Sequence, residues 1–277
     1  MKSLRSLSAL SMILAIGLTF VASHSAVAKE PGLLFAHRGG AHEFEENTLP
    51  AFQASYEKGL RGFETDVRMT RDGKFVILHD DNLERTHSGE GHVEELTAGE
   101  LKTVKSKKSG LPLLFLDDLL EEFADKPGVY FEFEMKTGNK DLYPDARLEE
   151  YCRRLLETLA ARKPEGSQYV LTSFDKRPLK LVKQIAPEAD ILLIVSNGKC
   201  TDAEVSEAQS LGATRIGVRI DKVTRAEVVA AQKAGLRVSC WPGQSVQDYQ
   251  LAVGLGVDAI CCDIPIAIQT WKEQHEK

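Results

Sequence analysis

Short apolar runs alternate with longer amphipathic segments along most of the chain. Nine apolar runs resemble buried strands, at residues 33–36, 62–67, 75–78, 129–135, 169–172, 191–195, 215–218, 237–240 and 259–262. Seven segments repeat apolar residues at helical spacing, at residues 49–58, 116–124, 146–162, 178–185, 202–211, 225–234 and 246–255. This alternation predicts an α/β fold with a parallel sheet. The 277 residues suit one (β/α)8 TIM barrel, which typically needs about 250 residues.

The pattern contains one apolar run more than an eight-stranded barrel requires. We therefore expect one of the nine runs to lie outside the barrel, and the pattern does not indicate which one. Residues 70–73 form a turn too short to hold a helix between the second and third runs. Residues 80–110 are mostly polar, and we interpret them as a small insertion after the third strand, over one end of the barrel.

The first 28 residues have the features of a cleavable export signal. Lys2 and Arg5 precede a mostly apolar stretch at residues 7–22, and Ala26-Val27-Ala28 follows the small-x-small pattern of cleavage sites. We therefore predict cleavage near Ala28 and a mature barrel over residues 29–277 in the periplasm or outside the cell. A second long apolar run is absent from the sequence, so we expect no stable membrane anchor.

Overall charge and cysteine content add two further expectations. The formal net charge is −6, which argues against a nucleic-acid partner because such proteins usually carry a basic excess. Five cysteines are too few and uneven for a disulfide framework, and the simplest interpretation is that they are small buried residues. If one disulfide exists, Cys240 with Cys261 or Cys262 is the first pairing to test. The sequence leaves the oligomeric state open.

Ionisable side chains gather at the ends of the early strands. They are His37, Arg38, Glu64, Asp66, His79, Glu134 and Lys136. In a (β/α)8 barrel the carboxyl ends of the strands converge on the face where active sites are built. Alternate residues of a strand share one side, so Glu64 should point the same way as Asp66, and Glu134 the same way as Lys136. We therefore expect three carboxylates, two histidines and two cations at one mouth of the barrel.

Three carboxylates so close together would repel one another unless a cation lies among them. Ligand sets made only of oxygen favour Mg²⁺ or Ca²⁺ over zinc. Arg38 and Lys136 are suitable partners for phosphate oxygens. With a divalent cation and one phosphodiester included, the charges of the expected site sum to zero. The residues thus predict a site for one divalent cation and a phosphodiester.

Several short motifs resemble those of the glycerophosphodiester phosphodiesterase family. In chain order they are His37-Arg38-Gly39, Glu46-Asn47-Thr48, Glu64-x-Asp66, His79-Asp80, Glu134-x-Lys136, Gly256-Val257-Asp258 and Asp263-x-Pro265. Each motif is weak alone, but their order and spacing are specific, and the resemblance extends over residues 33–266. It implies a barrel of the PLC-like phosphodiesterase type.

The resemblance also implies a role for eight residues. His37 and His79 would be the catalytic acid–base pair, Glu64, Asp66 and Glu134 the metal ligands, Arg38 and Lys136 the phosphate contacts, and Trp241 the lining of the glycerol side. Glu46 is left between three roles: it could brace the site, cap the following helix or bind the metal. Glu132 points the same way as Glu134 but lies deeper, as a supporting partner or a protonated buried acid.

The implied activity is hydrolysis of glycerophosphodiesters to an alcohol and glycerol 3-phosphate with Ca²⁺ or Mg²⁺, through a cyclic phosphate. Two alternatives remain open from the sequence: a phosphodiesterase for choline-bearing lysolipids or sphingolipids, and an exported protein that binds glycerophosphodiesters without cleaving them. Pro242 stands where the family often has threonine, and Glu132 where it often has a neutral residue. Both departures leave the preferred leaving group open.

Overall fold

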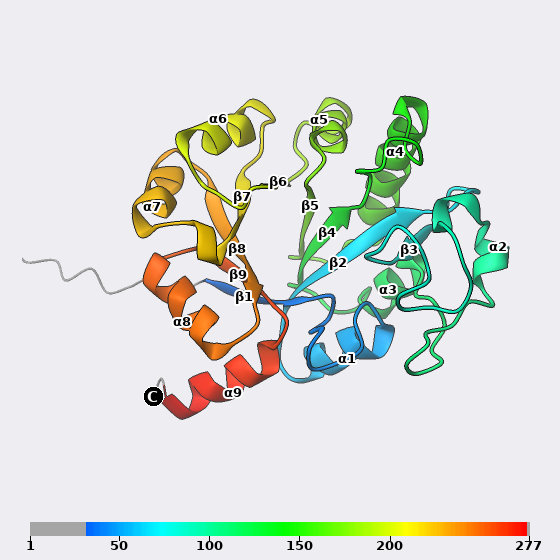
Figure 1. Cartoon of the computed structure of the whole chain (residues 1–277), viewed down its shortest axis with the longest axis horizontal. Helices are drawn as coiled ribbons and strands as arrows, with labels where there is room; N and C mark the ends of the chain where they lie inside the picture. Colours follow the sequence, from blue (N-terminus) through cyan, green and yellow to red (C-terminus); the bar gives the residue numbers. More distant parts are fainter. Residues whose placement is uncertain (1–31, 276–277) are drawn as a thin grey trace, which may run out of the picture.

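Eight parallel strands close into a barrel in the computed structural model, which describes residues 32–275 (Figure 1). The strands are β1 (Leu33–His37), β2 (Gly62–Met69), β4 (Tyr130–Met135), β5 (Gln168–Ser173), β6 (Ile191–Ile194), β7 (Arg215–Arg219), β8 (Arg237–Gly243) and β9 (Ala259–Cys262). Their order is β1-β9-β8-β7-β6-β5-β4-β2, and the pairing of β1 with β2 closes the ring. The predicted barrel is confirmed.

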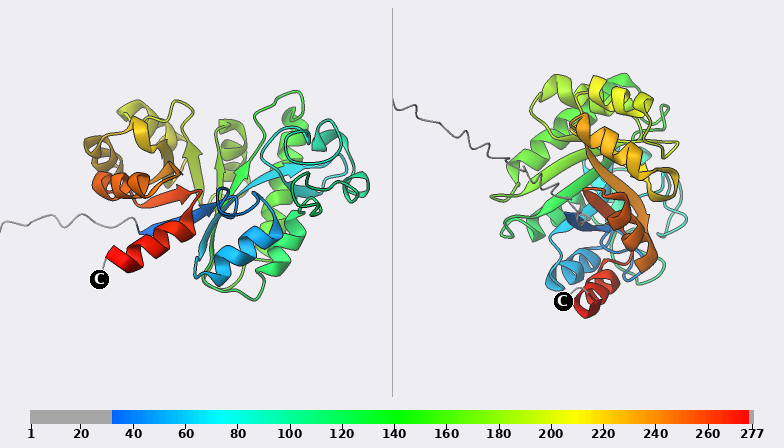
Figure 2. Two further views of the ribbon diagram at one scale, coloured as in Figure 1. Left: turned by 60° about the horizontal axis from the view of Figure 1, so that its bottom comes forward. Right: turned by 90° about the vertical axis from the view of Figure 1, so that its left-hand side faces the viewer.

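Helices surround the barrel on its outer side (Figure 2). They are α1 (Leu49–Glu57), α2 (Ala98–Leu101), α3 (Leu116–Glu122), α4 (Asp145–Ala161), α5 (Lys176–Ile185), α6 (Asp202–Ser210), α7 (Arg225–Lys233), α8 (Val246–Leu255) and α9 (Pro265–His275), with 3-10 turns η1 (Val93–Glu95) and η2 (Ile220–Lys222). The seven predicted helices are present with small shifts at their ends. Helix α9 was not predicted; Figures 1 and 2 place it beside α1, where the first and last strands of the barrel meet.

The third apolar run is the one outside the barrel. It forms β3 (Phe75–Ile77), which pairs antiparallel with the far end of β2, Val67 opposite Ile77 (Figure 1). The turn before β3 is tight: the amide of Thr70 donates to the carbonyl of Lys74 at 2.7 Å. So short a connection can only reverse the chain, because a parallel crossover needs a dozen residues or more. His79, which follows this run, therefore does not end one of the parallel barrel strands.

The segment interpreted as an insertion, residues 80–110, is irregular apart from η1 and α2. It packs on β3 through its own hydrophobic cluster, which comprises Val76, Leu78, Leu83, Val93, Leu101, Val104 and Leu113. Thr97 closes the start of α2 with a capping box to Glu100. The segment is thus held by a small core separate from that of the barrel.

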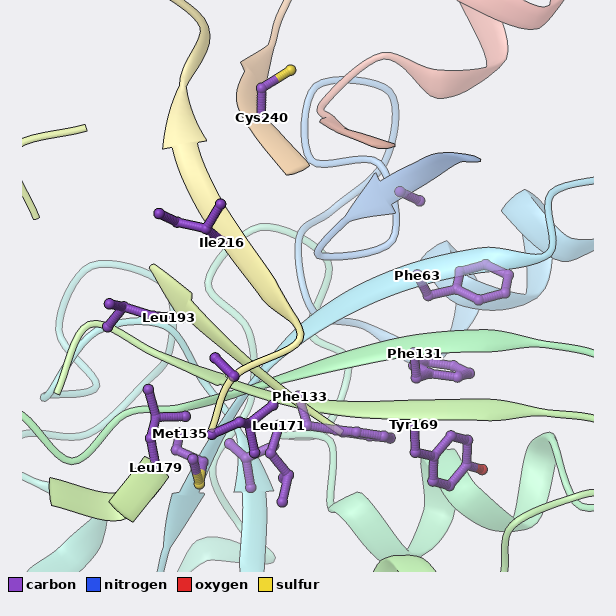
Figure 3. Packing of buried hydrophobic residues seen from close by; sticks show 14 of the residues in the cluster. Phe63, Phe131, Phe133, Met135, Tyr169, Leu171, Leu179, Leu193, Ile216 and Cys240 are labelled. Atoms are coloured by element: carbon purple, nitrogen blue, oxygen red, sulfur yellow. The ribbon is translucent and has the colours of Figure 1, made fainter. Parts of the chain in front are cut away.

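Alternation along each strand separates two layers of the barrel core. Phe131 and Phe133 of β4 point outward toward the helices, and their rings stack at a centroid distance of 5.4 Å (Figure 3). Tyr130 belongs to the inner cluster with Phe35, Val170, Leu192, Ala259 and Cys261. Glu132 and Glu134 share the inner side with Tyr130 because side chains alternate along a strand. The same rule that buries the phenylalanines therefore places the carboxylates inside the barrel.

All five cysteines are buried and unpaired. Cys240 belongs to the outer layer (Figure 3) and Cys261 to the inner one, so the sheet separates them. The thiol of Cys262 donates to the carbonyl of Gly243 at 2.9 Å. The disulfide proposed as the first to test is absent, and the cysteines act as small buried residues.

The predicted export signal, residues 1–28, lies outside the described residues. Within residues 32–275, none of the helices combines the length and the apolar character needed to cross a membrane.

Candidate active site

Three carboxylates meet inside the carboxyl end of the barrel, as predicted. Glu64 and Asp66 project from β2, and the strand register places Glu134 of β4 opposite Asp66. One oxygen from each carboxylate lies within 4.8 Å of the others. All three residues are buried, so they form a compact acidic cluster with little access to water.

This acidic cluster fits a cation. Glu64 Oε1 and Asp66 Oδ1 are buried without a hydrogen-bond partner in the described part of the chain. Burial raises the pKa of Glu64 well above its usual value, and the negative charges of Asp66 and Glu134 raise it further. A divalent ion among the three carboxylates would satisfy the unpaired oxygens and stabilise the ionised forms. Oxygen donors of this kind suit Ca²⁺ or Mg²⁺.

A second group of potential ligands is less suitable for a metal. His37, Glu64 and Cys261 also bring one ligand atom each within 4.8 Å of one another. Burial raises the pKa of the Cys261 thiol well above its usual value. Because metals bind the thiolate, the protonated thiol weakens this group as a site.

The two predicted phosphate contacts border the acidic cluster. Arg38 Nε lies 3.3 Å from Asp66 Oδ2, and Lys136 Nζ lies 2.8 Å from Glu134 Oε1 and 3.6 Å from Asp66 Oδ1. Burial alone would raise the pKa of Asp66, but the charges of Lys136 and Arg38 outweigh it and lower that pKa. Both cations are thus bound to the carboxylates, at the rim where a phosphate group would approach.

Two non-glycine residues beside the cluster have left-handed backbones. Arg38 has φ 51° and Asn47 φ 57°, a conformation that is uncommon outside glycine. It lets the Arg38 amide donate to the Glu64 backbone carbonyl at 3.0 Å and to Glu64 Oε2 at 3.1 Å. Asn47 Nδ2 donates to Asp66 Oδ2 at 2.8 Å. The sequence pattern named Asn47 within a motif but missed that it orients a carboxylate of the cluster.

His37 is the last residue of β1 and is held by a partner from the other end of the chain. Its Nδ1 lies 2.5 Å from Asp263 Oδ1, and its Nε2 faces Glu64 Oε2 at 3.8 Å. Gln244 Nε2 donates to the second oxygen of Asp263 at 2.9 Å. Burial alone would raise the pKa of Asp263, but the hydrogen bonds from His37 and Gln244 outweigh it and lower that pKa. Asp263 therefore directs Nε2 of His37 toward the acidic cluster.

The sequence pattern missed this role of Asp263, although it named Asp263 as part of the closing motif. The available signal was topological: in a closed barrel the last strand pairs with the first. Here β9 pairs with β1, which brings residues 226 positions apart into contact.

His79 reaches the same mouth from the β2–β3 hairpin. Its Nδ1 lies 2.8 Å from Asp80 Oδ1, and its backbone carbonyl accepts from Arg68 Nη2 at 2.9 Å. Asp80 Oδ2 in turn accepts from Arg85 Nε at 2.5 Å. Burial alone would raise the pKa of Asp80, but the hydrogen bonds from Arg85 and His79 outweigh it and lower that pKa. His79 is thus fixed on its Nδ1 side, like His37.

Arg85 of the insertion connects Asp80, which holds His79, with Glu46, which contacts Arg38. Besides Asp80, it binds both oxygens of Glu46, with Nη2 at 2.6 Å from Oε1 and Nη1 at 3.1 Å from Oε2. Glu46 Oε1 also accepts from Arg38 Nη1 at 3.2 Å. Glu46 therefore braces the site, and the three-carboxylate group found in residues 32–275 does not include it. Sequence reasoning did not single out Arg85.

We expect Arg85→Met to lower kcat about 10- to 100-fold with little change in KM, because residues that orient active-site groups typically have effects of this size. Loss of Arg85 frees Asp80 and Glu46, and with them His79 and Arg38. Steady-state kinetics on folded protein tests this. The control is Arg71→Met, which removes an exposed arginine paired with Glu100 at 3.2 Å. An unchanged kcat in Arg85→Met would show that the bridge does not position the site.

Two hollows open at this mouth. An inner recess of about 150 Å³ runs into the barrel, and His37, Arg38, Glu64, Glu134 and Trp241 are among its lining residues. An outer recess of about 360 Å³ lies over the ends of β4 and β5 and is lined by Lys136. His79, Glu134 and the exposed ring of Phe174 border both recesses. The predicted site residues thus come together around two adjoining recesses.

A closed barrel with a buried carboxylate cluster and two carboxylate-bound histidines at its mouth has the layout of a barrel phosphodiesterase. Residues 37–267 match the Glycerophosphoryl diester phosphodiesterase family, and the chain belongs to this family. A glycerophosphodiester phosphodiesterase of Caldanaerobacter subterraneus subsp. tengcongensis is 30% identical over 242 residues, covering 84% of this chain and 94% of the relative.

Other known proteins agree with this family membership. The glycerophosphodiester phosphodiesterase of Bacillus subtilis is 24% identical over 250 residues, covering 84% of each chain. Among solved structures, an Oleispira antarctica phosphodiesterase in complex with the product sn-glycerol-3-phosphate has a TM-score of 0.79 and 23% identity. The match covers 87% of this chain and 96% of that chain. At this identity the structural likeness shows the shared fold.

Proposed function

We propose that the protein hydrolyses glycerophosphodiesters to an alcohol and sn-glycerol 3-phosphate. The observation that carries this proposal is the acidic cluster of Glu64, Asp66 and Glu134 with His37 and His79 at its rim. Family membership and the product bound in the Oleispira antarctica structure support the same substrate class.

The acidic cluster would hold one Ca²⁺ or Mg²⁺ ion, which when bound would lower the pKa of a substrate hydroxyl and offset charge on the phosphoryl oxygens. His37 Nε2 takes the proton of the glycerol hydroxyl next to the ester, and Asp263 stabilises the imidazolium that results. That hydroxyl oxygen bonds to phosphorus while the bond to the leaving alcohol breaks. His79 supplies the proton to the leaving oxygen.

The product of this first step is a cyclic phosphate. Water then opens the ring, with His79 accepting a proton from the water and His37 returning one to the glycerol oxygen. Arg38 and Lys136 stabilise the negative charge on the phosphoryl oxygens in both steps. The two histidines thus end in the protonation states in which they began.

The described side chains favour the substrate's own hydroxyl as the nucleophile. Ser173, the nearest serine considered from sequence, is buried, and its Oγ donates to the carbonyl of Met135 at 2.9 Å. Cys261 lines the inner recess, but burial raises the pKa of its thiol. A neighbouring hydroxyl also benefits from proximity, with effective molarities of roughly 10⁵–10⁸ M in well-oriented systems.

The test is to incubate residues 29–277 with glycerophosphocholine, glycerophosphoethanolamine and an analogue that lacks the hydroxyl next to the ester. We expect glycerol 3-phosphate from the first two, a transient cyclic phosphate by phosphorus NMR, and very slow turnover of the analogue, which should inhibit competitively. Normal hydrolysis of the analogue would mean that water attacks directly. No glycerol 3-phosphate from either natural substrate would overturn the proposed activity.

We also propose that the protein acts after export. The support is the N-terminal pattern of Lys2, Arg5, the apolar stretch at 7–22 and Ala26-Val27-Ala28. Mass spectrometry of protein purified from the cell envelope should find Lys29 as the first residue. An intact Met1 on the mature protein would contradict cleavage.

A further inference from the structure

We propose that the inner recess binds the glycerol part of the substrate and that Glu132 and Thr172 select it by binding its terminal hydroxyl. The inference rests on the proposed function and goes beyond it, because it assigns a specificity-determining pair to the interior of the barrel. Three observations carry it: how the histidines divide the two recesses, the unpaired polar atoms inside and the limited space at the inner end.

The histidines decide which end of the substrate enters which recess. His37 lines the inner recess and not the outer one, whereas His79 lines both. The proposed base, His37, must reach the attacking glycerol hydroxyl, and the proposed acid, His79, must reach the leaving oxygen. The glycerol therefore enters the inner recess, and the leaving alcohol lies toward the outer recess, which opens over the loops after β4 and β5.

The inner recess contains polar atoms that lack partners. Thr172 is fully buried, and its Oγ1 has no hydrogen-bond partner among the described residues; the same holds for Trp241 Nε1. Both residues line the recess, together with Ser239 and Glu132. Unpaired buried polar atoms are costly unless a ligand satisfies them. A small hydroxylated ligand supplies both the donors and the acceptors that these groups need.

Glu132 is fixed beside the metal ligands. The hydroxyl of Tyr130, two residues earlier on β4, donates to Glu132 Oε1 at 2.5 Å, so that oxygen already has a hydrogen-bond partner. The strand register pairs Glu132 with Glu64 on β2. When the attacking hydroxyl of a glycerol lies at the acidic cluster, the terminal carbon of that glycerol therefore extends toward Oε2 of Glu132. A carboxyl oxygen of Glu132 can accept a hydrogen bond from a hydroxyl there.

The inner end has room for glycerol but not for a longer group. The recess has a volume of about 150 Å³, and a Cβ on Gly217 in its wall would lie only 2.9 Å from Leu192 Cδ2, so this wall is already closely packed. Farther from the mouth, the barrel interior is filled by Phe35, Tyr130, Val170 and Leu192. An acyl chain on the terminal hydroxyl would have to displace these packed side chains. The recess thus selects an unacylated glycerol.

The experiment compares two substrates that differ only in the terminal hydroxyl: glycerophosphocholine and its 1-deoxy analogue, which keeps the attacking hydroxyl. We expect the wild type to prefer glycerophosphocholine by about 10- to 100-fold in kcat/KM, the usual effect of one buried hydrogen bond. Glu132→Leu and Thr172→Val should lose most of this preference, because activity on glycerophosphocholine falls while activity on the analogue is retained. Lysophosphatidylcholine should not be hydrolysed by the wild type.

Two further variants separate selection from damage to the fold. Glu132→Gln keeps the size of the side chain and its ability to form the hydrogen bond, so it should retain much of the preference for glycerophosphocholine over the 1-deoxy analogue. If only the charge of Glu132 mattered, this variant would lose the preference. Leu251→Ala, an exposed residue of α8 that is 44% accessible, serves as the control and should leave the ratio unchanged. Because the readout is a ratio between two substrates, a general loss of activity does not imitate the expected result.

The outcomes also distinguish this inference from the proposed function. If the wild type hydrolyses both substrates equally well, the activity stands and the assigned subsite is wrong. The subsite is likewise wrong if folded Glu132→Leu and Thr172→Val keep the wild-type ratio. If the wild type hydrolyses neither substrate, the proposed function fails first.

Discussion

Removing divalent cations by chelation should abolish glycerophosphodiester hydrolysis, and Ca²⁺ or Mg²⁺ should restore it. The reason is the acidic cluster, whose buried oxygens Glu64 Oε1 and Asp66 Oδ1 have no hydrogen-bond partner among residues 32–275. An ion that binds the folded protein but not the unfolded chain stabilises the folded state. The same ions should therefore raise Tm in the absence of substrate. Activity and thermal unfolding, each measured across a metal titration, provide two independent readouts.

Glu64→Gln tests which residues hold the ion. The change keeps the volume of the side chain but removes one charge, so a higher metal concentration should be needed for both activity and the rise in Tm. Glu121→Gln, on the exposed side of α3, serves as the matched control because it removes a carboxylate far from the cluster. Full activity of a protein verified to be free of metal would rule out this assignment.

Alanine at His37 or at His79 should lower kcat by at least about two orders of magnitude, the lower end of the range for positioned acid–base groups. The two side chains are 27% and 35% exposed at the barrel mouth, so their removal should leave the packed core intact. Circular dichroism and thermal unfolding establish the fold of each variant before single-turnover rates are compared.

His42→Ala provides the control for the histidine variants. His42 Nε2 also approaches Asp263, at 3.6 Å from Oδ2, but its side chain is 51% exposed and it is not among the residues that line the two recesses. Its loss should change kcat only slightly. Near-normal rates in a folded His79→Ala variant would show that another group protonates the leaving alcohol.

Local sequence pattern was sufficient for the barrel and for the acidic cluster. Strand character depends on runs of apolar residues, and alternation along a strand determines which side chains share its inner side. Glu64 and Asp66 are two residues apart on one strand, and Glu134 occupies the equivalent place two strands later in the sequence. Their convergence therefore followed from strand order and the known geometry of a barrel.

Contacts between distant segments required the tertiary structure. Apolar content does not reveal the direction of β3, because that direction depends on the pairing of β3 with β2. His79 follows β3 and therefore reaches the barrel mouth from a hairpin, not from the end of a parallel strand. Asp263 contacts His37 because the barrel closes. Arg85 reaches Glu46, 39 residues earlier in the chain, and also binds Asp80, because the insertion packs on its own small core. The sequence by itself determined the barrel, the family and which ionisable side chains gather at the barrel mouth. The tertiary structure decided how those groups are held, because their hydrogen-bond partners are neighbours in space and not along the chain.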